Sequence, residues 1–112
     1  MKGDDISERL IDFAVRIIRL ADSLPKTQVG RHIAGEIVRA GTSAGANYEE
    51  ARGAESLSDF IHKIGVALKE LRETIFWLKI IKRTKMISPN RMADELCAIL
   101  VSSVVTAKKK RT

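Results

Sequence analysis

A run of small residues between Arg39 and Phe60 limits what this chain can fold into more than any other stretch. Gly41, Ala44 and Gly45 follow one another at helical spacing, so a helix through them would have one thin face. Each glycine inside a helix costs about 1 kcal/mol relative to alanine. Because that cost must be offset elsewhere, we expect neighbouring helices to lie unusually close to the thin face.

Three polar residues lie beside this face. Ser43, Asn47 and Glu50 recur at i, i+4 and i+7, so on a helix they form one polar stripe. A carboxylate and an amide near a core are costly unless they are hydrogen-bonded. We therefore predict a buried, hydrogen-bonded polar seam that fixes helix register or subunit pairing, as single buried asparagines do in coiled coils. A functional use of the same stripe is the alternative.

The remaining apolar residues recur in alternating steps of four and three, which is the spacing of amphipathic helices. Pro25, Gly53 and the pair Ser88–Pro89 carry the stop and start signals between these segments. Since the connections are short, we predict a single domain over residues 1–112, an all-α, antiparallel up-and-down four-helix bundle. The predicted helices cover residues 5–24, 27–52, 57–84 and 89–108, and a basic tail follows at 108–112.

The first of these helices carries a second apolar stripe besides its core seam. Ile11, Val15 and Ile18 form this stripe on a different face of the helix. One bundle core cannot cover both stripes, and exposed contiguous apolar surface usually marks an interface. We therefore predict that Ile11, Val15 and Ile18 pack against another subunit.

Charge and composition limit the class of partner and the compartment. The chain has 20 Lys and Arg against 14 Asp and Glu, a net charge of +6. This excess fits a phosphate-bearing or other acidic partner, and it fits a solubilising Lys-rich tail equally well. The single cysteine, Cys97, cannot form a disulfide within the chain. With no apolar run near the roughly 18 residues of a membrane span and no signal-peptide pattern, we expect a soluble, cytoplasmic protein with no membrane partner.

Two short motifs suggest chemistry, but each lacks residues that its chemistry requires. Gly41–Gly45 spells the G-x-S-x-G pattern of a nucleophile elbow, which needs a strand before the serine, and none is predicted. Asp59 and His62 have the spacing of half of a di-iron site, and the second half is missing. We therefore predict a protein that is not an enzyme and holds no metal or cofactor.

The predicted topology gathers cations at one end of the bundle, where the first and third helices end and the second and fourth begin. Phosphate binding needs such a concentration of positive charge. The alternative is that cations near a helix C-terminus only offset the helix dipole. Because aromatic residues are scarce, we expect contacts with the nucleic-acid backbone rather than base stacking. The predicted nucleic-acid-binding residues are Lys26, Arg31, Lys79, Lys82, Arg83, Lys85 and Arg91.

Segments 39–50, 59–63 and 69–78 resemble the four-helix-bundle family linked to bacterial 23S rRNA intervening sequences, or S23-type proteins. That family includes proteins similar to the accessory variability determinant of diversity-generating retroelements. Its most specific match is Ser43-x-x-x-Asn47-x-x-Glu50 with the later Asp59-Phe60, whereas Ala51 stands where glycine is commoner. The resemblance implies a four-helix bundle assembled into a homopentameric ring. The retroelement branch implies binding to nucleic acid and to a reverse transcriptase.

Two functions follow from these patterns. The first is a non-enzymatic homo-oligomer that binds the backbone of RNA or DNA through its basic end. The second is a protein-interaction scaffold, or an accessory subunit for a partner enzyme such as a reverse transcriptase, with little nucleic-acid affinity of its own.

Overall fold

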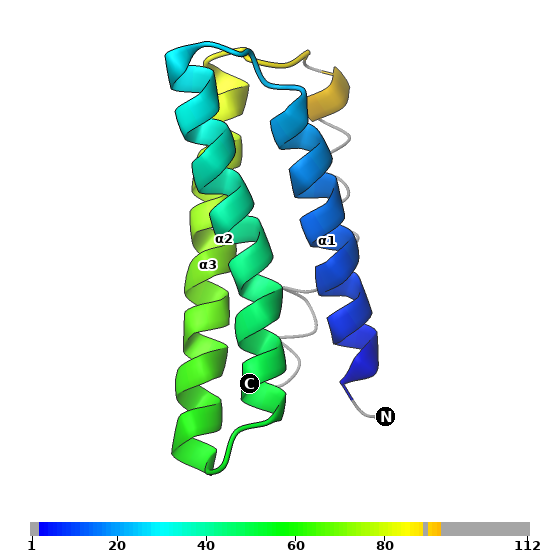
Figure 1. Ribbon diagram of the computed structural model, residues 1–112, viewed down its shortest axis with the longest axis vertical. Coiled ribbons are helices and arrows are strands. Elements are labelled where there is room, and N and C mark those ends of the chain that lie inside the picture. The colour runs from blue at the N-terminus through cyan, green and yellow to red at the C-terminus, as the bar shows by residue number, and fades with distance from the viewer. Residues whose placement is uncertain (1–2, 89, 93–112) are drawn as a thin grey trace.

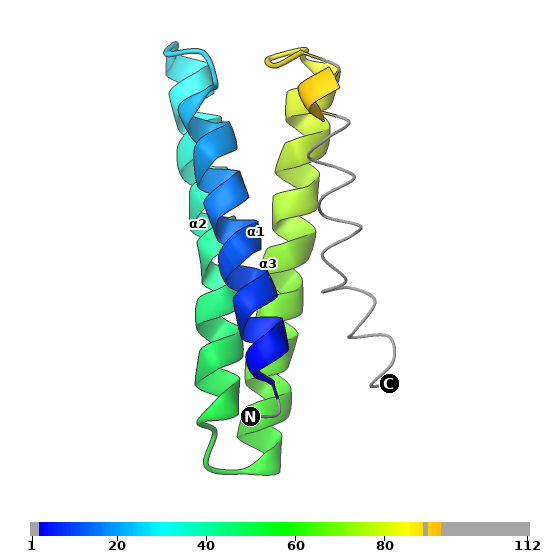
Figure 2. The same ribbon diagram turned by 90° about the vertical axis from the view of Figure 1, so that its right-hand side faces the viewer.

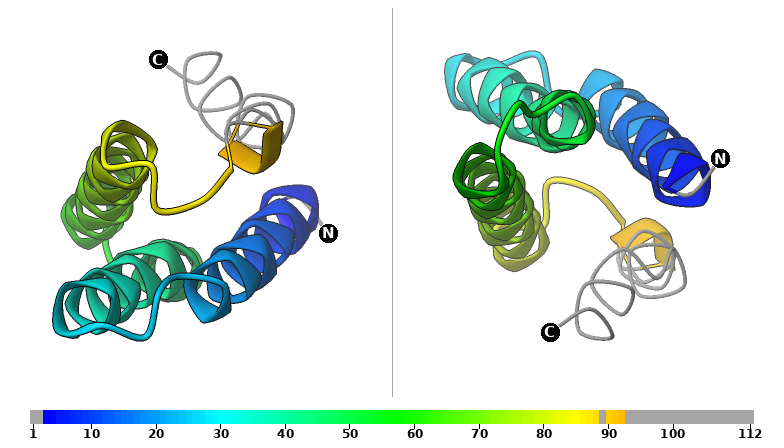
Figure 3. Two further views of the ribbon diagram at one scale, coloured as in Figure 1. Left: turned by 90° about the horizontal axis from the view of Figure 1, so that it is seen from above. Right: turned by 90° about the horizontal axis from the view of Figure 1, so that it is seen from below.

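The computed structural model describes residues 3–88 and 90–92, which form an antiparallel all-α bundle (Figure 1). Its helices are α1 (Asp4–Asp22), α2 (Gln28–Arg52) and α3 (Leu57–Arg83), and residues 90–92 are helical again. Seen along the helices, α2 lies between α1 and α3 (Figure 3). The described part of the chain contains no strand. The predicted all-α class is thus confirmed.

The ends of α1, α2 and α3 lie within two residues of the predicted boundaries. Of the predicted helix over 89–108, only residues 90–92 are described, and the tail at 108–112 lies outside the described residues. No helix among the described residues is both long and apolar enough to cross a membrane.

Side-chain caps lie at the starts of α2, α3 and the helical residues 90–92. Thr27 Oγ1 accepts a hydrogen bond from the Gly30 amide at 3.0 Å, and Ser56 Oγ accepts one from the Asp59 amide at 3.1 Å. Ser88, one of the signals named from the sequence, likewise accepts a hydrogen bond from the Arg91 amide at 3.3 Å. Each cap satisfies one of the amide groups that a helix leaves unpaired at its start.

The connection between α1 and α2 is tightly packed. Helix α1 ends at Asp22, two residues before the predicted boundary, and the Ser23 hydroxyl donates to the Leu20 carbonyl at 2.7 Å. Leu24 then enters the core. A Cβ built on Gly30 would lie 2.0 Å from the Pro25 carbonyl oxygen, so only glycine fits at this point of the turn. The connection between Ser23 and Thr27 is therefore packed closely against the first turn of α2.

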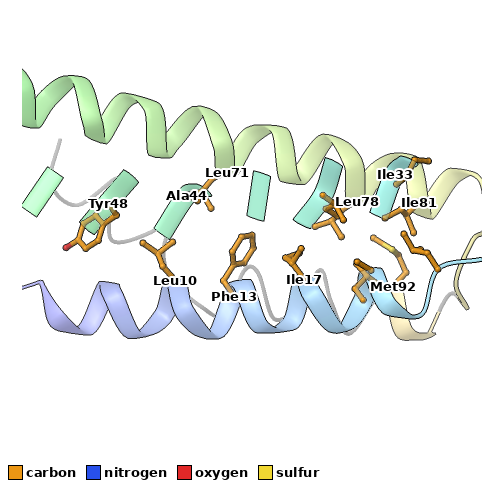
Figure 4. Close-up of a cluster of buried hydrophobic side chains, with 14 residues drawn as sticks. Leu10, Phe13, Ile17, Ile33, Ala44, Tyr48, Leu71, Leu78, Ile81 and Met92 are labelled. Carbon is orange, nitrogen blue, oxygen red and sulfur yellow. The ribbon is translucent and has the colours of Figure 1, made fainter. Parts of the chain in front are cut away.

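The core is a cluster of buried apolar side chains between the inner sides of the helices (Figure 4). Leu10, Phe13 and Ile17 of α1 are buried, as the four-three spacing predicts, and they face α3 residues that include Leu71 and Leu78. The last described segment closes the core with a buried Met92, and the half-buried Ile87 packs against the same cluster.

The thin face of α2 lies against α1, as expected. A Cβ on Gly41 would lie 2.9 Å from Cγ2 of Ile17, and a Cβ on Gly45 would lie 3.4 Å from Cβ of Leu10. Real Cβ atoms do not approach a neighbour within 3.0 Å, so the backbone at Gly41 comes closer to α1 than alanine would permit. The close approach offsets the intrinsic cost of glycine in a helix.

Candidate nucleic-acid interface

The antiparallel topology brings the predicted cations to one end of the bundle. The end of α1, the start of α2, the end of α3 and residues 90–92 all lie there (Figures 1 and 2). Arg91 is half-buried, and the other predicted binding residues are exposed. These exposed residues are Lys26, Arg31, Lys79, Lys82, Arg83 and Lys85.

The last turns of α3 explain why its cations face solvent. Leu78 and Ile81 are fully buried and fix which side of the helix faces the core. Lys79, Lys82 and Arg83 consequently project from the remaining sides.

Helix α3 ends in a left-handed turn at Lys85. This residue has φ 57°, and the Met86 amide donates to the Ile81 carbonyl at 3.2 Å, as in a Schellman motif. Glycine is the usual residue at such a position, because a side chain there costs about 1–2 kcal/mol. The need to end the helix would favour glycine at position 85 and therefore does not explain why a lysine is found there.

The hydrogen bonds of these cations go to backbone carbonyls. Lys26 Nζ donates to the Asp22 carbonyl at 2.9 Å, and Arg91 Nη2 donates to the Arg19 carbonyl at 3.4 Å. Within residues 3–88 and 90–92, no ion pair joins a predicted binding cation to a carboxylate. These cations are thus not ion-paired with any carboxylate of the described residues.

The opposite end of the bundle is different, because its charges are paired. Arg52 binds Asp4 at 2.6 Å and Glu49 at 3.5 Å, and it also donates to Ser7 Oγ at 2.8 Å. Hydrogen bonding to Asp4 raises the pKa of the Arg52 guanidinium above its ordinary value. Among the described residues, the ion-paired Arg52 thus contrasts with the cations of the basic end.

A shallow pocket of about 230 Å³ lies within the basic end. Its described walls combine the apolar side chains of Leu78 and Met92 with the cations Lys79, Lys82 and Arg83. Cationic groups around a concave surface are suited to binding a phosphate, because they attract its negative charge.

The predicted buried polar seam is wrong for the single chain. Ser43 and Asn47 are half-buried, and Asn47 Nδ2 donates to the Ser43 carbonyl of its own helix at 2.8 Å. Glu50 is exposed, and its Oε2 lies 3.7 Å from Nζ of Lys63 in α3. The i, i+4, i+7 spacing places the three residues on one side of α2, but near the helix end that side reaches solvent. A part in subunit pairing stays a prediction.

The second apolar stripe of α1 lies outside the core. Ile11, Val15 and Ile18 are 54%, 37% and 41% exposed. Next to Ile11, a groove of about 200 Å³ runs between α1 and α2, and its floor includes Ala14 and Gly45. The packing of this stripe against another subunit stays a prediction.

The sequence does not predict an ion-pair network that joins α2 to α3. Arg39 Nη1 binds Glu70 Oε2 at 3.0 Å, and the same guanidinium binds Glu73 and Glu36. Glu70 is buried, and its hydrogen bond to Arg39 raises the pKa of the guanidinium despite desolvation. A glutamate beside Leu71 in the apolar seam was the one signal for this pair. Its partner depends on the register of two helices, which spacing does not give.

Trp77 lies at the edge of the core rather than wholly on the surface. Its indole packs against the apolar cluster, and Nε1 donates to Glu73 Oε2 at 3.3 Å. In the single chain Trp77 thus belongs to the edge of the core.

The two catalytic motifs have no suitable surroundings. Helix α2 continues without a break through Gly41–Gly45, so Ser43 is not on a strand-turn-helix elbow. In the part of the chain that the structure describes, no group of three or more His, Cys, Asp or Glu residues is placed to hold a metal ion.

Fold and site together define a class: a small antiparallel helical bundle with a basic end whose described cations form no ion pairs. The model of the family described as 23S rRNA-intervening sequence protein matches residues 4–101, so the chain belongs to this family. The predicted family is confirmed.

A solved structure from Bacteroides thetaiotaomicron, described as a protein of unknown function from the S23 ribosomal protein family, is similar over the whole length. It is 34% identical, the match covers 96% of this chain and 99% of that chain, and the TM-score is 0.81. No curated protein matches the chain.

Proposed function

We propose that this protein is a non-enzymatic, homo-oligomeric bundle that binds the backbone of RNA or DNA through its basic end. The observation that carries the proposal is the difference between the two ends. Arg52 and its neighbours are paired with carboxylates, whereas Lys82, Arg83 and Lys85 have no carboxylate partner among the described residues. Positive charge without local compensation is available to an external polyanion.

Backbone binding of this kind is driven by the release of counterions from the nucleic acid. It gives affinity without sequence preference, because phosphates are the same at every position. The family name, which refers to an intervening sequence of 23S rRNA, supports RNA as the first ligand to test.

Oligomerisation would strengthen this binding. The exposed Ile11, Val15 and Ile18 supply an apolar surface for contact between copies, and the family resemblance suggests a pentameric ring. A ring whose axis runs along the helices would place every basic end on the same rim.

The test is a salt series of RNA binding measured by fluorescence anisotropy. For the variant K82A/R83A/K85A/R91A, we expect weaker binding and a log-log salt slope smaller by roughly 3–4, because each lost phosphate contact removes about 0.9. The charge-matched comparison is K82A/R83A against R9A/K63A, which removes two cations of the opposite half. Equal affinities for these two variants would refute the basic end as the binding site.

An accessory or scaffold role for a partner enzyme, such as a reverse transcriptase, is the second candidate. The apolar residues Leu57 and Ile61 at the start of α3 favour it, since they are 74% and 60% exposed. This function would be preferred if the wild-type protein bound neither RNA nor DNA at low salt.

A further inference from the structure

The outward side of α3 carries a continuous stripe of exposed residues. Its members follow one another in steps of three and four, so they lie one above another along the helix. Leu78, two positions or about 200° from Phe76, is buried on the opposite side. The α3 stripe consists of Lys69, Arg72, Phe76, Lys79 and Arg83, all of them exposed.

No carboxylate interrupts the α3 stripe. The acids of this part of the helix, Glu70 and Glu73, lie toward α2 and are bound by Arg39. Within the described ranges, no ion pair involves a cation of the stripe. Lys79 and Arg83 also belong to the basic end, so the stripe extends that positive surface along α3.

Phe76 is the unusual member, because it is a large aromatic residue that is 53% exposed among cations. Its ring packs edge-to-face against Trp77, with the centroids 5.2 Å apart. Trp77 is held in turn by Glu73 and by an edge-to-face contact with His32 at 6.1 Å. The Phe76 ring is thus supported from one side while much of its surface remains open.

We propose that the α3 stripe binds an unpaired stretch of nucleic acid, with its cations on phosphates and one base stacked on Phe76. This inference rests on the proposed function and specifies which form of nucleic acid the protein prefers. From Lys69 to Arg83 the stripe is about 21 Å long. A stacked strand rises about 3.4 Å per nucleotide, so roughly six nucleotides would span it.

The aromatic ring is what favours an unpaired strand over a duplex. Inside a duplex, every base is stacked between its neighbours and offers only an edge, so a protein ring cannot stack on it. Base stacking on aromatic side chains tolerates any sequence and is a recurring device of single-strand binding. Binding of phosphates alone does not explain why Phe76 is exposed between the cations of the α3 stripe.

The experiment compares a fluorescent 12-nucleotide oligouridine with a 12-base-pair RNA duplex, for the wild type and variants of Phe76. We expect Phe76→Ala and Phe76→Leu to bind the single strand at least about fivefold more weakly. Binding of the duplex should change less than about twofold, because it uses only the cations. Phe76→Trp keeps an aromatic face and should retain the affinity for the single strand.

The outcomes separate this inference from the proposed function. If the wild type binds RNA and the loss of the ring changes nothing, or weakens both probes equally, the α3 stripe is not a stacking site although the basic end still binds. If the wild type binds neither probe, both proposals fail. If Phe76→Ala changes the molar mass measured by light scattering, the ring belongs to a protein interface, and the inference is overturned.

Discussion

The contact between Gly41 and Ile17 allows a quantitative test of how α1 and α2 pack. A Cβ on Gly41 would lie 2.9 Å from Cγ2 of Ile17 and 3.2 Å from its Cβ and Cγ1. Ile17 is fully buried and β-branched, so these atoms lie close to the backbone and cannot swing aside. The substitution Gly41→Ala therefore forces the two helices apart.

The magnitude follows from two opposing effects. Adding a methyl group to a well-packed core costs about 1–3 kcal/mol, while replacing a glycine inside a helix by alanine gains about 1 kcal/mol. Gly35 is the matched control, because it lies in the same helix, is exposed, and has no atom within 4 Å of its Cβ position. Gly35→Ala should show the gain alone, so the two variants should differ by about 1–3 kcal/mol.

Urea denaturation followed by circular dichroism, at one fixed protein concentration, measures this difference. We expect Gly35→Ala to raise the midpoint and Gly41→Ala to lower it or leave it unchanged, with equal m-values. If Gly41→Ala were as stable as Gly35→Ala, the close approach of α1 to α2 would be refuted.

Three further substitutions test other features. Lys85→Gly should stabilise the fold by about 1 kcal/mol, because glycine adopts φ 57° without strain, and should weaken RNA binding at low salt; unaltered binding would exclude Lys85 from the interface. Arg39→Met should lower Tm because it leaves Glu70 buried and unpaired, and adding Glu70→Gln should recover part of the loss; a double variant no more stable than Arg39→Met would contradict this account of the network. Val15→Asp combined with Ile18→Asp should yield monomers in light scattering, whereas an unchanged oligomer would contradict the role of the α1 stripe.

The elements that the sequence predicts well depend on local signals. Ser88 caps a helix where the pair Ser88–Pro89 predicts a start, and the four-three spacing identifies the buried face of α1. The cluster of cations at one end follows from antiparallel topology alone, because short connections force alternate helix ends together. The end of α1 at Asp22, two residues before the predicted boundary, is not indicated by the spacing.

The prediction that was wrong and the contact that was not predicted both depend on how two helices are aligned. The spacing of Ser43, Asn47 and Glu50 gives a common side of α2 but not what that side faces. The bond from Arg39 to Glu70 joins residues 31 positions apart, so it requires the register of α2 against α3. The exposure of Phe76 likewise required the structure, because its neighbours Ile75 and Trp77 are half-buried.

The compact turn between α1 and α2 has a consequence for how a ligand is met. Because only glycine fits against the Pro25 carbonyl at Gly30, and Leu24 anchors the same turn in the core, the backbone that carries Lys26 and Arg31 is already ordered in the free protein. Little chain entropy then remains to be lost on association. The rate at which a polyanion binds near Lys26 and Arg31 should accordingly be limited by diffusion and depend on ionic strength, rather than be limited by rearrangement of the protein.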